Sequence, residues 1–183
     1  LWANHQLVTI ATGASDSLLA AQIRDRGPEM REAYEALARQ RTANQMFSQL
    51  PQTEMEQALL DAHGFRVHIQ HDYVQVQDTT ATAAGRPGAF VRYRRVLSDT
   101  WRDFFVFAQD SVTALPSQDE LDRITNDLLR QFAEGSLDSS YVQLEASRPM
   151  TRDTAEIAGR TALEQRGFWQ TTLVPMGGSY LRY

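Results

Sequence analysis

The sequence predicts an α+β fold, with a mainly antiparallel sheet, N-terminal helices and one long helix (about 117–134) packed on the sheet. Apolar residues recur at helical spacing in the first third of the chain, whereas an alternation of period two predominates later. Strands that follow one another in runs, with helices segregated between them, are typical of α+β domains. We expect one domain over residues 1–183, in which 1–64 would form a helical half and 65–183 a sheet–helix half.

The chain begins with a short apolar run that contains β-branched residues, Gln6–Thr12, and this pattern predicts a strand. Asp16 is placed to cap a helix, because a carboxylate before a helical run accepts hydrogen bonds from free backbone amides. The pair Gly27-Pro28 then predicts a break, so that a second helix would start at Pro28.

The second helix would run as far as Leu50, with a modest apolar stripe that includes Met30 and Leu37. Thr53 would cap a third helix, which Gly64 would end, since glycine readily adopts the left-handed conformation found after helices. We expect these helices to pack into the core, as amphipathic helices usually do.

From residue 65 the period changes to two, and the alternation in Phe65–Gln70 predicts a half-buried strand. Glycine and proline in Ala81–Gly88 predict a loop. Two further strands, Ala89–Val96 and Trp101–Gln109, are separated by four residues, which suits an antiparallel hairpin.

The long helix has the clearest signals in the chain. Ser117 and Glu120 have the spacing of a capping box, and Gly135 follows the last apolar position of the helix. Strands are predicted after it, with a hairpin turn at Gly159-Arg160 and a turn at Pro175–Gly178. The expected strands are Ser140–Ser147, Asp153–Gly159, Arg160–Thr172 and the closing strand Gly178–Tyr183.

Composition excludes several kinds of chemistry. The net charge is -5, whereas proteins that bind nucleic acid normally carry a basic face, so we expect no nucleic-acid partner. The chain has no cysteine and no lysine, which excludes thiol nucleophiles, iron–sulfur clusters and Schiff-base chemistry. We therefore expect no cofactor, and no apolar run is long enough for a membrane span.

Few residue clusters suggest catalysis. His68, His71 and Asp72 resemble metal ligands, but strand residues three apart point to opposite faces and zinc needs at least three ligands. Glu164 shares a strand face with Arg166, which would keep its carboxylate ionised and unsuited to act as a general acid. We expect no metal site and no enzymatic activity.

Arginines are concentrated on the strand that follows the predicted loop. Arg92 and Arg94 share one face of this strand and are candidates for binding a carboxylate or a phosphate, because guanidinium groups form forked hydrogen bonds with both. The alternative is a cross-strand pairing with an acidic residue such as Asp103 or Glu164.

The C-terminal third carries a recognisable series of motifs: a Ser-Tyr pair before a strand, a glycine turn, a small-x-Glu-x-Arg-Gly-x-Trp sequence and a Gly-Gly pair before the last tyrosines. The chain resembles domain-of-unknown-function family 4837, envelope lipoproteins of Bacteroidota-type bacteria. The resemblance implies a periplasmic or envelope location with a membrane anchor in the full-length form, and we expect a lipoprotein signal before Leu1. The matching positions are Ser140, Tyr141, Gly159, Ala162, Glu164, Arg166, Gly167, Trp169, Gly177, Gly178, Tyr180 and Tyr183.

Two functions remain open. The first is a non-enzymatic envelope domain that binds a protein partner or serves as an accessory subunit of a membrane-associated assembly. Membrane association would then come only from a lipid anchor or a partner outside this chain. The second is the binding of a small anionic ligand in a cleft between the sheet and the long helix, through Arg92 or Arg94. Tryptophan, tyrosine and arginine are common interface anchors, so the candidate contact residues at the C-terminal end are Arg166, Trp169, Tyr180 and Arg182.

Overall fold

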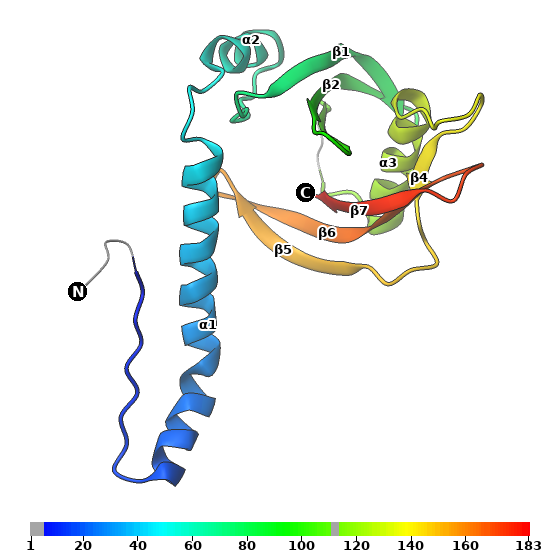
Figure 1. The fold of residues 1–183 in the computed structure, drawn as a ribbon. Helices are drawn as coiled ribbons and strands as arrows, with labels where there is room; N and C mark the ends of the chain where they lie inside the picture. Colours follow the sequence, from blue (N-terminus) through cyan, green and yellow to red (C-terminus); the bar gives the residue numbers. More distant parts are fainter. Residues whose placement is uncertain (1–5, 111–113) are drawn as a thin grey trace. The chain divides into compact units, whose positions relative to one another are not determined.

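A computed structural model describes residues 6–110 and 114–183 of the chain (Figure 1). Over these residues the fold is α+β, as predicted, with three helices and seven strands. The chain divides into two compact units, Leu1–Tyr73 and Val74–Tyr183. Among the described residues, no helix combines the length and the apolar character needed to cross a membrane.

Helix α1 (Asp16–Met46) is continuous, so the break predicted at Gly27-Pro28 is wrong. Proline in a helix interior costs about 3 kcal/mol, but the strong helix formers on both sides favour continuation, and an ion pair between Arg26 and Glu29 (3.1 Å) spans the proline. The N-cap is Ser15 and not Asp16, because the Ser15 hydroxyl accepts the hydrogen bond from the amide of the first turn.

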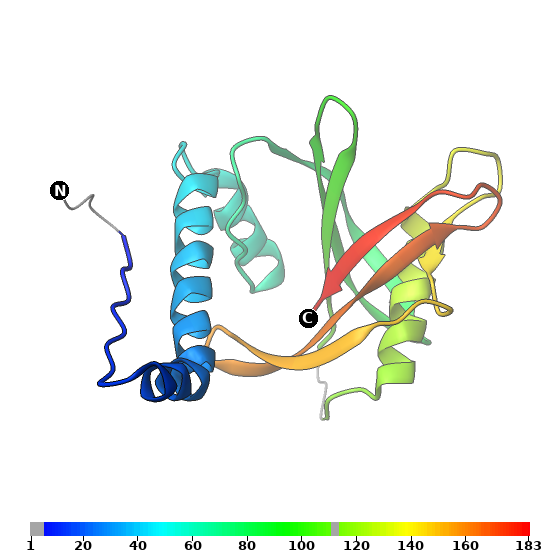
Figure 2. The same cartoon turned by 60° about the horizontal axis from the view of Figure 1, so that its bottom comes forward.

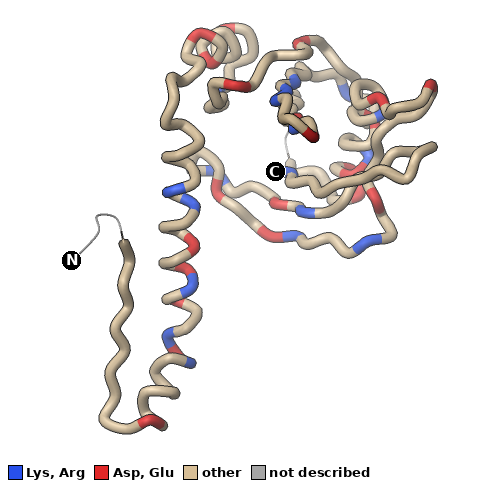
Figure 3. Tube along the Cα trace, in the orientation of Figure 1, with Lys and Arg blue, Asp and Glu red and all other residues tan. Residues whose placement is uncertain are grey.

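None of the 31 residues of α1 is buried, so the core packing predicted for this part of the chain is wrong. Charges of both signs follow one another along the helix (Figure 3), which leaves too little apolar surface for burial. The strand predicted at Gln6–Thr12 is also wrong: this segment forms no ladder in the described structure. It runs beside α1 (Figures 1 and 2), to which the Tyr34 hydroxyl connects it by donating to Thr9 Oγ1 at 3.1 Å.

Helix α2 (Thr53–His63) ends at Gly64 in the left-handed conformation (φ 74°), as predicted, but its N-cap is Gln52 and not Thr53. The strand predicted at Phe65–Gln70 is wrong, although burial does alternate there and Ile69 is fully buried. The buried Glu56 carboxylate of α2 accepts the Ile69 amide at 3.0 Å, so a side chain takes the place of a ladder partner.

The first sheet has the strand order β1 (Tyr73–Ala83), β2 (Arg86–Val96) and β3 (Trp101–Ala108). The antiparallel hairpin of β2 and β3 is confirmed. The loop predicted at Ala81–Gly88 is wrong, because β1 and β2 continue to a two-residue turn at Ala84-Gly85. Both turn residues have positive φ (48° and 77°), as the tight turns between twisted antiparallel strands require.

The second sheet is built around the long strand β6 (Arg160–Thr171), which pairs antiparallel with β4 (Val142–Leu144), β5 (Thr151–Ile157) and β7 (Gly177–Arg182). The predicted closing strand is therefore confirmed. The turn before β6 lies one residue earlier than predicted, at Ala158-Gly159.

The Gly-Gly pair predicted in a turn lies instead at the start of β7, and neither glycine has positive φ. Their role is to leave room for Trp169 on the neighbouring strand. A Cβ atom at Gly177 would lie 2.5 Å from the Trp169 carbonyl oxygen, and one at Gly178 would lie 2.9 Å from the indole Nε1.

Helix α3 (Gln118–Phe132) has the predicted cap, since the Ser117 hydroxyl accepts the Glu120 amide at 3.2 Å. Its apolar side packs against the first sheet: Leu128 is buried together with Phe90, and Phe132 stacks on Phe90 with ring centroids 4.1 Å apart. A different side of the helix carries polar residues that bind the second sheet. Helix α3 therefore joins the two sheets of this unit.

Candidate functional site

The two arginines predicted on β2 share one acceptor, the Asp103 carboxylate of β3. Arg94 donates from Nε to Oδ1 at 2.8 Å and from Nη2 to Oδ2 at 2.9 Å, and Arg92 donates from Nε to Oδ2 at 3.0 Å. Arg92 also donates to the Phe132 carbonyl at the end of α3. Burial alone would raise the pKa of Asp103, but hydrogen bonds from Arg94 and Arg92 outweigh it and lower this pKa. An internal carboxylate thus occupies the position considered for a ligand.

An exposed tryptophan at the end of the β2–β3 hairpin was not among the predicted site residues. Trp101 is 63% exposed and lies opposite Val96, which is 64% exposed. The guanidinium carbon of Arg94 lies 4.2 Å from the ring centroid of Trp101. The hairpin end extends beyond the other strands of its unit (Figure 2). A tryptophan next to a turn, with arginines on both strands, is the sequence signal that could have revealed this site.

The four C-terminal candidates do not form one surface, because side chains alternate between the two faces of β6 and β7. Arg166 lies on the outer face, with a 64% exposed side chain, and donates to Glu164 at 2.6 Å. This hydrogen bond lowers the pKa of Glu164, in agreement with the predicted ionised carboxylate. The other three, Trp169, Tyr180 and Arg182, belong to the opposite face, which meets α3.

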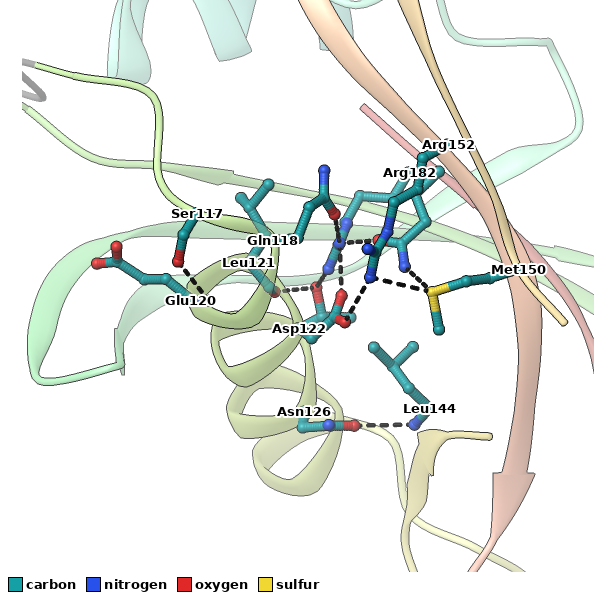
Figure 4. A network of polar contacts seen from close by, with 12 residues as sticks. Ser117, Gln118, Glu120, Leu121, Asp122, Asn126, Leu144, Met150, Arg152 and Arg182 are labelled. Atoms are coloured by element: carbon teal, nitrogen blue, oxygen red, sulfur yellow. Dashed lines mark hydrogen bonds and ion pairs between the residues drawn. The ribbon is translucent and has the colours of Figure 1, made fainter. Parts of the chain in front are cut away.

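Arg182 is the centre of a polar network between α3 and the second sheet (Figure 4). It donates to Thr125 Oγ1 at 2.6 Å and to Asp122 Oδ1 at 2.7 Å, and also to Gln165 Oε1. Only 15% of its side chain is exposed. Burial lowers the pKa of Arg182, and the Asp122 carboxylate opposes this shift. Arg182 therefore connects β7 to α3.

A second arginine stands in the same row of the sheet. Arg152 on β5 is the register partner of Gln165 on β6, which in turn is the partner of Arg182 on β7. Arg152 lies 3.8 Å from Asp122 Oδ2 and donates to the Met150 sulfur at 3.4 Å. Its side chain is 46% exposed. The row therefore has a covered arginine, Arg182, at one end and a partly exposed one, Arg152, at the other.

Tyr180 lies beside this row, with its ring over Gly167 of β6. A Cβ atom at Gly167 would be 2.8 Å from Cε1 and 2.9 Å from the hydroxyl oxygen of Tyr180. The hydroxyl oxygen is buried and has no hydrogen-bond partner within residues 6–110 and 114–183. Burial raises the pKa of Tyr180, while Arg182 and Arg152 act in the opposite direction.

The residues considered as metal ligands are used in other ways. His68 Nδ1 lies 3.2 Å from the buried Glu56 carboxylate, and His71 lines an open depression with Phe47 and Pro51. Over the part of the chain that the structure describes, no group of three histidine or acidic side chains could hold a metal ion.

The fold and these sites define a small α+β domain in which one helix joins two antiparallel sheets through arginine-centred networks. The family model described as Domain of unknown function (DUF4837) matches residues 52–183, and the chain belongs to this family. The resemblance seen in the C-terminal motifs is thereby confirmed. Comparison with curated proteins and with solved structures finds no match. The family match contains the hairpin end and the arginine row, and begins after α1.

Proposed function

We propose that this chain is a non-enzymatic domain that binds a partner protein, as an accessory subunit of a membrane-associated assembly of the bacterial envelope. The observation that carries this proposal is the exposed Trp101 at the end of the β2–β3 hairpin, stacked against Arg94. The envelope location rests on the resemblance of the C-terminal motifs to envelope lipoproteins, and the anchor would lie outside this chain.

The hairpin end has the properties of an interface anchor. Tryptophan and arginine are the residues most enriched among those that dominate binding energy. The Arg94 guanidinium is fixed by its hydrogen bonds to Asp103 and in turn supports the Trp101 ring. An aromatic side chain that is already ordered loses little entropy when a partner covers it. Trp101 and Val96 together offer an apolar centre for such a contact.

The charge of the hairpin favours an acidic partner. Residues 92–103 contain four arginines and two aspartates, although the whole chain has a net charge of -5. Arg102, which follows Trp101 in the chain, is exposed. An acidic surface around an apolar pocket would complement this charge and accept the Trp101 ring.

Retention of a partner from envelope extracts by the immobilised chain would test the proposal. We expect Trp101→Ala to weaken binding of the recovered partner by about 2 kcal/mol, or roughly 30-fold in Kd, and Arg102→Glu to abolish it at low salt. Two controls replace exposed residues far along the sequence, Leu173→Ala and Arg123→Glu, and should bind normally. Recovery of no partner, or equal binding by all four variants, would contradict the proposal.

The second function predicted from sequence, binding of a small anion between sheet and helix, is favoured by a different observation. Arg92 and Arg94 both already donate to the Asp103 carboxylate. On the second sheet, Arg152 is incompletely paired, so we place the anion-binding site there.

A further inference from the structure

We propose that the cross-strand row Arg152–Gln165–Arg182, together with the hydroxyl of Tyr180, is a binding site for a small carboxylate or phosphate anion. The ligand would lie on the face of the second sheet that meets α3, at the Arg152 end of the row. This site is independent of the hairpin end and of the partner protein proposed for it.

The charges in the row are not balanced. Two guanidinium groups face a single carboxylate, that of Asp122, which is committed to Arg182 at 2.7 Å. Its distance to Arg152 is 3.8 Å, too long for a hydrogen bond. Among the residues that the structure describes, Arg152 otherwise donates to the Met150 sulfur, which is a weak acceptor. A guanidinium has five donors, so Arg152 retains the capacity to bind an anion through a fork.

Tyr180 provides a second donor next to the row. Its hydroxyl is buried and makes no hydrogen bond to any residue that the structure describes, and a buried donor without an acceptor is unfavourable by about 1–3 kcal/mol. Gly167 has no side chain, which allows the ring to lean over β6, and Tyr180 interacts electrostatically with both arginines of the row. An anion held by Arg152 could accept the hydroxyl proton in a hydrogen bond and remove this cost.

The exposure of the two arginines indicates where a ligand would enter the site. Arg182 is covered by α3, whereas the side chain of Arg152 is 46% exposed. We therefore expect a ligand to enter from the Arg152 side. The guanidinium fork of Arg152 suits a carboxylate or a phosphate group, because both accept forked hydrogen bonds.

The first sheet offers an internal comparison. Arg92, Arg94 and Asp103 also combine two arginines with one carboxylate, but there both carboxylate oxygens accept hydrogen bonds of 2.8–3.0 Å and Arg92 has the Phe132 carbonyl as well. In that cluster both arginines therefore have strong acceptors within the fold. The row in the second sheet differs because, within the described part of the chain, Arg152 and the Tyr180 hydroxyl lack comparable acceptors.

Binding of inorganic phosphate and of acetate, followed by NMR chemical shifts in chloride-matched buffer, tests the proposal. We expect saturable shifts in the wild type, and affinities about tenfold weaker in Arg152→Gln and in Tyr180→Phe, the loss expected when one hydrogen bond to a charged group is removed. Arg123→Gln, a change at an exposed arginine of α3, is the matched control and should bind normally. Thermal unfolding of each variant verifies that it is folded.

A second arm distinguishes a free anion from a lipid headgroup. Vesicles of phosphatidylglycerol, with phosphatidylcholine vesicles as the reference, are sedimented with the wild type and the same variants. Binding in either arm that Arg152→Gln and Tyr180→Phe weaken supports the site and identifies its source. No binding in either arm, or equal binding by the variants, overturns the proposal.

Discussion

The contact between Gly167 and Tyr180 gives the most direct test of the geometry of the second sheet. In the substitution Gly167→Ala, the added Cβ atom would lie 2.8 Å from Cε1, 2.9 Å from the hydroxyl oxygen and 3.0 Å from Cζ of Tyr180. Non-bonded carbon atoms prefer separations of about 3.5–4.0 Å. The ring must therefore move by roughly half an ångström or more.

The magnitude follows from two opposing terms. Overpacking of this kind costs about 1–3 kcal/mol, whereas replacing glycine by alanine within a strand gains about 0.5–1 kcal/mol through lower chain entropy. We expect Gly167→Ala to lower the free energy of unfolding by about 1–2 kcal/mol. In a Tyr180→Ala background the ring is absent, so the same change should stabilise by about 0.5–1 kcal/mol.

Urea unfolding of the wild type, the two single variants and the double variant, followed by circular dichroism, measures both effects. The double-mutant cycle should give a coupling energy of about 1–3 kcal/mol, because the two residues are in contact. A neutral or stabilising effect of Gly167→Ala in the presence of Tyr180, or a cycle with no coupling, would show that the ring does not lie over Gly167.

Three further predictions concern the charged residues and helix α1. Arg182→Gln should lower the free energy of unfolding by about 3 kcal/mol, as expected when one partner of a covered ion pair is removed. Arg166→Gln, at the exposed pair, should leave the free energy of unfolding unchanged within error. Denaturant unfolding of both variants tests this difference, and equal losses would contradict it. Because the folded-state pKa of Asp103 is lowered, the ionised Asp103 stabilises the fold above its unfolded pKa, about 3.9, and this stabilisation is lost as the pH falls. The difference in unfolding free energy between wild type and Asp103→Asn should therefore shrink below about pH 4. A difference that stays constant with pH would refute the pairing. Gly27→Ala should raise helicity and gain about 0.8–1 kcal/mol, since a Cβ there meets nothing within 4 Å; a loss of helicity by circular dichroism would show that the helix does break at this position.

Local signals predicted the elements of the second unit better than those of the first. The serine cap at Ser117 and the hairpin of β2 and β3 are encoded by neighbouring residues, and both are found where expected. The predictions at Gln6–Thr12 and Phe65–Gln70 failed because a strand depends on a partner elsewhere in the chain. In the second case the Glu56 side chain takes the Ile69 amide, and no local pattern reports such a contact.

The candidate sites, too, could be predicted from the sequence only where the residues involved are close together in the chain. Alternation placed Arg92 and Arg94 on one face, and named Asp103 as an acidic partner, correctly. It could not show that Arg182 is covered by a helix some sixty residues earlier in the chain, in contact with Asp122. Nor could it find the row from Arg152 to Arg182, because that row depends on the register of three strands and not on sequence spacing.

Helix α3 explains why the arginines of this unit divide into structural and available groups. Arg92 donates to the Phe132 carbonyl at its C-terminal end, where a positive charge also complements the helix dipole. Arg182 binds the side chains of Asp122 and Thr125 nearer its N-terminal end. These two arginines connect the helix to the first and second sheets respectively, so replacing either should lower the free energy of unfolding. Arg152, the partly exposed arginine of the row, is not needed for that connection. Its replacement should therefore weaken anion binding and leave the free energy of unfolding unchanged.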